Sequence, residues 1–154
     1  MKDIVVYFTG TGKNKKVAEA IKEHLECDVI EVKDKLKRNF LRDSFYSLIH
    51  ASVEIEPKTF DFKDYERVFI VTPIWAFNIP APMRTFLTRN KDAIKDKEIV
   101  FVSSCGLGGK NRPVIDKLSK VIGKNVRVSL LIEETNVDSQ AYKDIISKFL
   151  DNIQ

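Results

Sequence analysis

Five apolar runs of strand length, separated by stretches of helical periodicity, constrain the fold of this 154-residue chain most strongly. The runs are rich in Val, Ile and Phe, and they occur at Ile4–Phe8, Val29–Val32, Val68–Val71, Ile99–Val102 and Val126–Ile132. Nearly continuous apolar runs are typical of strands that are buried on both faces. Strands that alternate with helices predict a parallel sheet covered on both sides. We therefore expect an α/β fold: a three-layer, doubly wound domain with a five-stranded parallel sheet.

Helical periods fill the stretches between and after these runs. Apolar residues share one helix face in the segments Val17–Leu25, Val114–Ile122 and Tyr142–Ile153. Pro82 and Pro113 stand where helices could begin, and Asp138 or Ser139 could cap the last helix. The segment Lys33–Asp61 is long for a simple connection, and helical spacing within it predicts an amphipathic helix, whole or broken. The apolar residues of that predicted helix are Leu36, Phe40, Leu41, Phe45, Leu48 and Ile49.

The composition is that of one globular domain, residues 1–154, with 44% hydrophobic and 31% charged residues. The formal net charge is +4, and the one local basic excess, Lys33–Arg42, is smaller than a nucleic-acid-binding patch requires, so we expect no nucleic-acid partner. Ile4–Phe8 is too short for a signal sequence or a membrane span, so we expect a cytoplasmic protein. Cys27 and Cys105 are expected to be reduced thiols, and no residue spacing indicates a metal site or a catalytic grouping.

Four small residues, Thr9-Gly10-Thr11-Gly12, separate the first predicted strand from the first helix. In an open parallel sheet, ligands bind beyond the carboxyl ends of the strands, and this loop stands there. The following helix points its free N–H groups into the same space, and glycines allow an anion to approach the backbone closely. The loop therefore indicates a phosphate-binding site.

Two common phosphate-binding patterns fit this loop poorly. A P-loop would require Ser or Thr after Gly12-Lys13, where the chain has Asn14, and a glycine at the position of Tyr7. A dinucleotide fingerprint would require a third glycine where Lys15 stands. Glu31, near the end of the second strand, keeps the dinucleotide reading open as a ribose ligand.

A hydroxyl-rich pattern, [ST]-x-T-G-x-[ST], fits better. Thr9, Thr11 and Gly12 match it, and Asn14 replaces the last hydroxyl with an amide. In this pattern the chain resembles the flavodoxin family. Two further stretches extend the resemblance to nearly the whole chain: "TPIWAFNIPAPMRTFL", which begins at Thr72, resembles a flavin-ring loop, and "SSCGLGG", which begins at Ser103, resembles the second flavin loop of flavodoxin-like quinone reductases.

The resemblance implies a sheet with strand order 2-1-3-4-5 and non-covalently bound FMN, with Trp75 stacked on the ring. The residues that it places at the cofactor are Thr9, Gly10, Thr11, Gly12, Lys13, Asn14, Thr72, Pro73, Ile74, Trp75, Ala76, Phe77, Asn78, Ser104, Cys105, Gly106, Leu107, Gly108 and Gly109. It further implies an electron-transfer flavoprotein that passes electrons between redox partner proteins. An FMN-dependent NAD(P)H:quinone-type oxidoreductase is the alternative, and a nucleotide-binding domain without redox work is a third reading.

Three departures from the family pattern carry expectations of their own. Lys13 adds a cation to a phosphate loop that usually has none, and it either points to solvent or contacts the phosphate. The ring loop lacks the glycine whose peptide turns in many flavodoxins; turning a peptide beside a residue with a Cβ is strained, so we expect a less stabilised one-electron-reduced flavin. Because the chain is basic, we expect a less negative low-potential step than is typical of the family.

Overall fold

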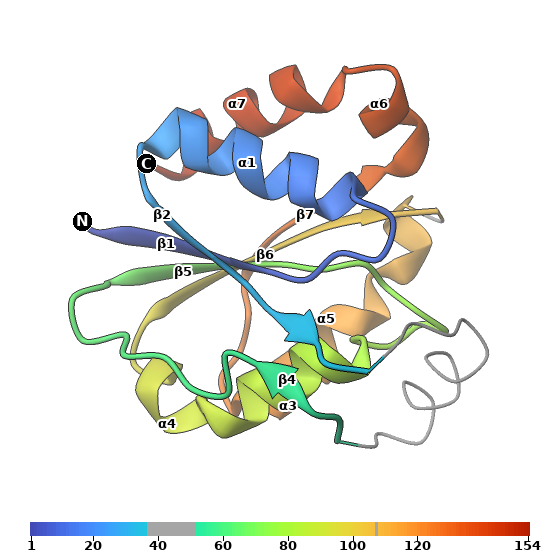
Figure 1. Ribbon diagram of the computed structural model, residues 1–154. Helices are drawn as coiled ribbons and strands as arrows, with labels where there is room; N and C mark the ends of the chain where they lie inside the picture. The colour runs from blue at the N-terminus through green and yellow to red at the C-terminus, as the bar shows by residue number, and fades with distance from the viewer. Residues whose placement is uncertain (37–51, 107) are drawn as a thin grey trace.

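One parallel sheet forms the centre of the fold (Figure 1). The computed structural model describes residues 1–36, 52–106 and 108–154. The strands of the sheet are β1 (Asp3–Tyr7), β2 (Asp28–Glu31), β5 (Arg67–Val71), β6 (Glu98–Cys105) and β7 (Val128–Glu133). Their spatial order is β2-β1-β5-β6-β7, with every neighbouring pair parallel. Counted along the chain this is the order 2-1-3-4-5, so the predicted fold class and strand order are confirmed.

Helices cover both faces of this sheet (Figure 1). One layer holds α1 (Lys13–Leu25), α6 (Glu134–Asp138) and α7 (Tyr142–Ile153), and the other holds α3 (Ala81–Arg89), α4 (Lys91–Ile94) and α5 (Pro113–Ile122). Successive strand residues point to opposite faces, so each strand feeds two cores. Phe69 packs in the core beneath α1 and α7, and its neighbour Ile70 packs in the core against α3 and α5.

The helix boundaries confirm one prediction and correct another. Pro82 and Pro113 lie in the first turns of α3 and α5, as expected. The expectation that Asp138 or Ser139 caps the last helix is wrong, because Asp138 ends the short helix α6 and α7 begins only at Tyr142. Helix α6 forms because Val137, which is fully buried, anchors it in the core.

The segment Lys33–Asp61 contributes a small antiparallel pair, β3 (Lys33–Asp34) with β4 (Ile55–Glu56). The amphipathic helix predicted here falls mostly outside the described residues. Leu36, the first of its apolar positions, is described and is 44% exposed. The remaining ones are Phe40, Leu41, Phe45, Leu48 and Ile49, all outside the described residues.

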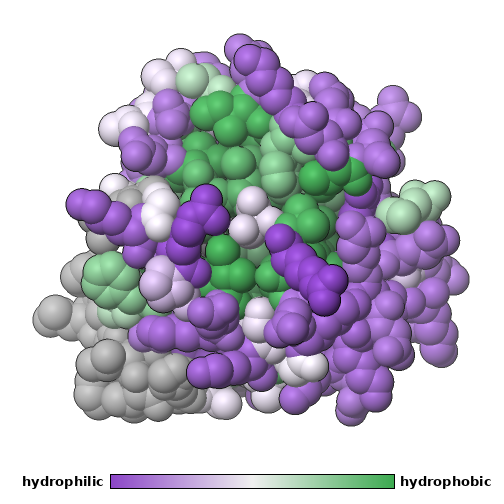
Figure 2. All heavy atoms as spheres, turned by 180° about the vertical axis from the view of Figure 1, so that it is seen from behind, coloured by the Kyte–Doolittle hydropathy of each residue, from purple (hydrophilic) through white to green (hydrophobic). Residues whose placement is uncertain are grey.

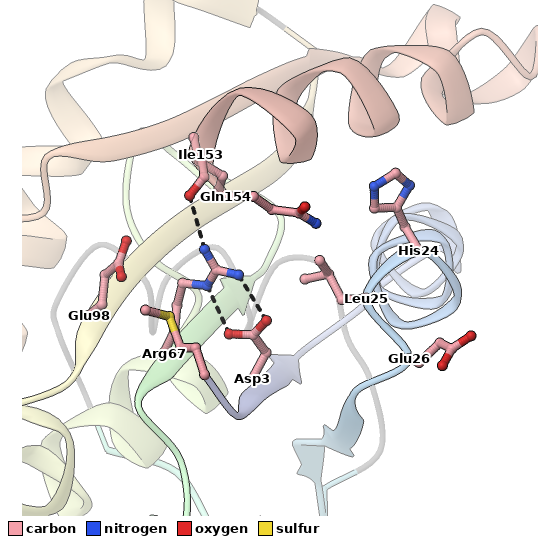
Figure 3. A pocket seen from close by; sticks show the side chains of 9 residues that line it. Asp3, His24, Leu25, Glu26, Arg67, Glu98, Ile153 and Gln154 are labelled. Atoms are coloured by element: carbon pink, nitrogen blue, oxygen red, sulfur yellow. Dashed lines mark hydrogen bonds and ion pairs between the residues drawn. The ribbon is translucent and has the colours of Figure 1, made fainter.

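A buried ion pair joins β1 and β5 at the amino-terminal end of the sheet (Figure 3). Arg67 Nε and Nη2 donate to the two carboxylate oxygens of Asp3, each at 2.8 Å, and Nη1 donates to the carbonyl of Ile153 at 3.2 Å. The side chains of Asp3 and Arg67 are only 9% and 5% exposed. The guanidinium therefore ties two strands and the end of α7 together.

The far edge of the sheet carries an apolar surface. Figure 2 shows apolar side chains gathered around β7, the last strand of the sheet. Val128, Leu130 and Leu131 on this strand are half-buried. Within the described residues, no helix has the length and apolar character needed to cross a membrane.

Candidate cofactor site

Three segments that follow β1, β5 and β6 meet at the carboxyl ends of these parallel strands (Figure 1). We call this end of the sheet the carboxyl edge. We name the three segments the first loop (residues 8–12), the second loop (residues 72–78) and the third loop (residues 104–109, which begins with the last two residues of β6). The first and second loops touch through the rings of Phe8 and Trp75, whose centroids lie 5.4 Å apart at an interplanar angle of 81°. The start of α1 touches the third loop through Asn14 and Ser104. The topology therefore brings together the three segments that the sequence singled out.

The first loop leads into the open N–H groups of the first turn of α1. Gly12 caps this helix with φ at +92°, a conformation that favours glycine, and its N–H donates to Thr9 Oγ1 at 3.0 Å. Among the residues that the structure describes, no side chain caps the helix, and its first turn contains no acidic residue. The Thr11 side chain is exposed. Open helical N–H groups with a hydroxyl beside them form an arrangement suited to an anion.

Asn14 and Lys13 direct their side chains elsewhere. Asn14 is 3% exposed; its Oδ1 accepts from the N–H of Ser104 at 2.9 Å and its Nδ2 donates to the Ser104 carbonyl at 3.3 Å. The Lys13 ammonium lies 3.1 Å from Glu134 and 3.2 Å from Asp138, and the hydrogen bond to Glu134 is the main cause that raises its pKa. Lys13 therefore pairs with α6 and does not simply point to solvent, and its contact with a phosphate stays a prediction.

The second loop forms a tight reverse turn. Trp75 and Asn78 exchange two backbone hydrogen bonds of 3.0 and 2.9 Å around the central residues Ala76 and Phe77. Those two residues have φ of +48° and +57°, although neither is glycine. Non-glycine residues in this region cost of order 1–3 kcal/mol each. From the sequence we expected backbone strain only when a peptide of this loop turns. The strain is instead already present at Ala76 and Phe77.

Side chains fix the carbonyls of this turn. Asn78 Nδ2 donates to the Ala76 carbonyl at 3.0 Å. Lys117 Nζ, from α5, donates to the Phe77 carbonyl at 2.9 Å and to Asn78 Oδ1 at 2.8 Å. Sequence reasoning missed Lys117, because nothing near it in the chain signals a contact with a turn about forty residues earlier.

The residues before this turn are buried or half-buried in the protein. Thr72 and Pro73 are buried, and the Thr72 hydroxyl contacts the Pro73 carbonyl at 3.4 Å. Ile74 is half-buried against the core on the α3 and α5 side. Trp75 is half-buried, whereas Phe77 is 54% exposed.

The third loop contains a buried hydroxyl without a partner. Ser104 is fully buried, and within the described residues no hydrogen bond to its Oγ is found. Cys105 is also buried, at 2% exposure. A Cβ added to Gly106 or Gly109 would meet nothing within 4 Å, so open space lies beside this backbone. Gly108 begins a short 3₁₀ helix, η1 (Gly108–Asn111), and Leu107 lies outside the described residues.

The residues that would form a dinucleotide-binding site do not support that hypothesis. Lys15, which replaces the third glycine, is exposed and pairs with Glu19 across one turn of α1 at 4.0 Å. Glu31, the possible ribose ligand, pairs with Lys33 at 3.8 Å. Burial, followed by the charge of Glu31, raises the pKa of Tyr7 to about 12, so this carboxylate faces the Tyr7 hydroxyl.

Solved structures with the same fold come from several organisms. A candidate flavoprotein from Bacteroides uniformis is 18% identical with a TM-score of 0.78, and 97% of each chain is covered. A flavoprotein in complex with FMN from Lactobacillus acidophilus is 20% identical with a TM-score of 0.68, covering 91% of this chain and 98% of the other. A flavodoxin from the domain Archaea is 20% identical with a TM-score of 0.56, covering 99% of each chain. At these identities the likeness establishes the fold.

Sequence comparison adds the family. No curated protein sequence matches the chain significantly. A family model described as "Flavodoxin domain" matches residues 39–143, which is more than half of the chain. This match confirms the resemblance drawn from the three loops, and the chain therefore belongs to the flavodoxin domain family.

Proposed function

We propose that this protein binds FMN non-covalently at the carboxyl edge of the sheet and transfers electrons between redox partner proteins. The observation that carries the proposal is the convergence of the three loops at one edge. On one side lies a helix start that no described side chain caps, and on the other lies the buried Ser104 hydroxyl, which has no hydrogen-bond partner among the described residues. Family membership and the FMN complex of a structural neighbour support the same cofactor.

The residues at this edge fit the two ends of FMN. The first turn of α1 supplies N–H groups for the phosphate, and Thr9 and Thr11 supply hydroxyls, so no cation is needed. Lys13 is already neutralised by Glu134 and Asp138. FMN, when bound, supplies one- and two-electron chemistry. The protein's part is to hold and orient it.

An aromatic side chain and a buried hydroxyl lie where the ring end of FMN would bind. Trp75 is half-buried and held edge-on by Phe8, so it offers an aromatic contact of fixed orientation. Ser104 Oγ, which has no partner among the described residues, offers a hydrogen bond to a ligand. Burial of a hydroxyl without a partner is costly, and a ligand that pairs with it offsets that cost.

Reconstitution tests the cofactor directly. The purified apoprotein is titrated with FMN by calorimetry and flavin fluorescence, and we expect stoichiometric, saturable binding. Thr11→Val replaces the hydroxyl with a methyl group of similar size and should weaken binding about fivefold, whereas Trp75→Ala should weaken it about tenfold or more.

Thr88→Val is the matched control for Thr11→Val, because Thr88 is another exposed threonine, on α3 and away from the three loops. It should bind FMN as the wild type does. A wild-type protein that ignores FMN, or a Thr88→Val variant that loses as much affinity as Thr11→Val, would contradict the proposed site.

A reductase activity is the second candidate, favoured by the glycine-rich third loop, which resembles that of flavodoxin-like quinone reductases. Steady-state oxidation of NADH or NADPH by the FMN-loaded protein with a quinone as acceptor separates the two. An electron carrier turns over no faster than free FMN at the same concentration, whereas a reductase exceeds it.

A further inference from the structure

The turn Trp75–Asn78 holds two consecutive residues in the left-handed region without a glycine. Two-residue turns of this kind normally use Asn, Asp or Gly at the central positions, because a Cβ is unfavourable there. Here the central residues are Ala76 and Phe77. An unfavourable backbone conformation persists only where surrounding contacts enforce it.

The enforcing contacts come from two side chains. Both central carbonyls accept a side-chain hydrogen bond, that of Ala76 from Asn78 and that of Phe77 from Lys117. Lys117 also donates to Asn78 Oδ1 at 2.8 Å and so orients the amide that holds Ala76. Removal of the Lys117 ammonium would thus release one carbonyl directly and the other through Asn78.

We propose that Lys117 is a positioning residue that holds the Trp75–Asn78 turn in its strained form and thereby sets the affinity and the potential of the flavin. The proposal rests on the proposed function, since it concerns the same site. It also gives a different physical reason why a peptide of this turn would resist reorientation. The obstacle is the pair of side-chain hydrogen bonds on the two carbonyls, because Ala76 and Phe77 already hold the strained φ values.

The neighbourhood of Lys117 provides a matched control. Lys117 and Lys120 lie one helical turn apart on α5, and both line a hollow of about 350 Å³ together with Asn78 and Arg84. Within the described residues, Lys120 makes no hydrogen bond or ion pair. Lys120→Met therefore removes the same charge from the same helix without touching the turn.

The experiment compares Lys117→Met, Lys117→Arg and Lys120→Met with the wild type, first as apoproteins. Trp75 is the one tryptophan of the sequence, so its fluorescence reports on the turn. Lys117→Met should raise the mobility of the Trp75 side chain in fluorescence anisotropy and speed amide exchange of residues 76–78. Lys117→Arg, which can donate to both acceptors, should restore the wild-type values, and Lys120→Met should not differ from them.

The same variants are then loaded with FMN. Lys117→Met should raise the Kd for FMN about tenfold and shift the midpoint potential to a more negative value than Lys120→Met does. Lys117→Arg should return both quantities toward wild type. Equal shifts in Lys117→Met and Lys120→Met would reduce the effect to charge alone and overturn the proposal, as would an unchanged turn in the Lys117→Met apoprotein. Absence of FMN binding by the wild type would instead refute the proposed function, while the apoprotein comparison still tests the turn.

Discussion

At the scale of single residues, Ser104 carries a conflict between stability and binding. Its hydroxyl is buried without a partner among the described residues, and such a group costs about 1–3 kcal/mol. Ser104→Ala should therefore leave the urea unfolding free energy of the apoprotein unchanged or raise it by about 1 kcal/mol, while weakening FMN binding. Ser103→Ala is the control, because the Ser103 hydroxyl already contacts the Ser104 carbonyl at 3.5 Å. Greater destabilisation by Ser104→Ala than by Ser103→Ala would disprove this account.

Cys27 offers a second residue-scale prediction. Burial, followed by the charge of Asp3, raises the pKa of its thiol from the usual 9.0 to about 11. The folded chain therefore holds this proton more tightly than the unfolded chain, and the resulting stability is present below pH 9 and lost as the pH rises toward 11. In a Cys105→Ser background, iodoacetamide labelling of the native protein should be half-maximal near pH 11, against about pH 9 in denaturant. Rapid native labelling at pH 8.5 would contradict the shift.

At the scale of elements, the Asp3–Arg67 pair joins β1, β5 and the end of α7 (Figure 3). Asp3→Asn leaves a buried guanidinium uncompensated, which costs about 3–5 kcal/mol. We expect a loss of this size in urea unfolding, and recovery of most of it in the double variant Asp3→Leu/Arg67→Met, which removes both charges. A double variant no more stable than Asp3→Asn would show that the pair contributes through more than charge compensation.

The elements also show what could be predicted from the sequence. The five strands were predictable because burial on both faces leaves continuous apolar runs, as in β5 and β6. The positions of the loops followed from the alternation of strands and helices. Helix α6 was missed because its five residues are too few for an apolar period. The contacts that hold it are the burial of Val137 and the ion pairs of Glu134 and Asp138 with Lys13, and Lys13 lies far earlier in the chain.

Side-chain directions within the site were beyond the reach of the sequence. Asn14 bonds to Ser104, ninety residues later, and Lys13 pairs with Glu134, still further along the chain. Local patterns identify which residues stand at the end of a strand. They do not identify which long-range partner an amide or an ammonium contacts. The Asn14 side chain was therefore assigned to a phosphate on position alone, and the Lys13 side chain was left open between solvent and phosphate.

At the scale of the whole molecule, the net charge of +4 bears on the potential. Reduction adds negative charge to the flavin, and a positive protein favours that charge. We expect the low-potential step, measured by spectroelectrochemical titration of the FMN-loaded protein, to be less negative than in acidic flavodoxins. The difference should shrink as salt is raised from 0.01 to 1 M, because long-range contributions are screened over about 30 Å and 3 Å respectively. A salt-independent or very negative value would contradict this expectation.

The double hydrogen bond between Asn14 and Ser104 has a consequence for how a cofactor arrives. One amide fastens the beginning of α1 to the end of β6, so the spacing between these two sides of the candidate site is set before any ligand binds. Capture of a nucleotide at this edge then requires little rearrangement of these two elements, and little ordering entropy is lost. Association would be governed by diffusion and by release of water. The backbones of α1 and β6 would be nearly the same in the free and the ligand-bound protein.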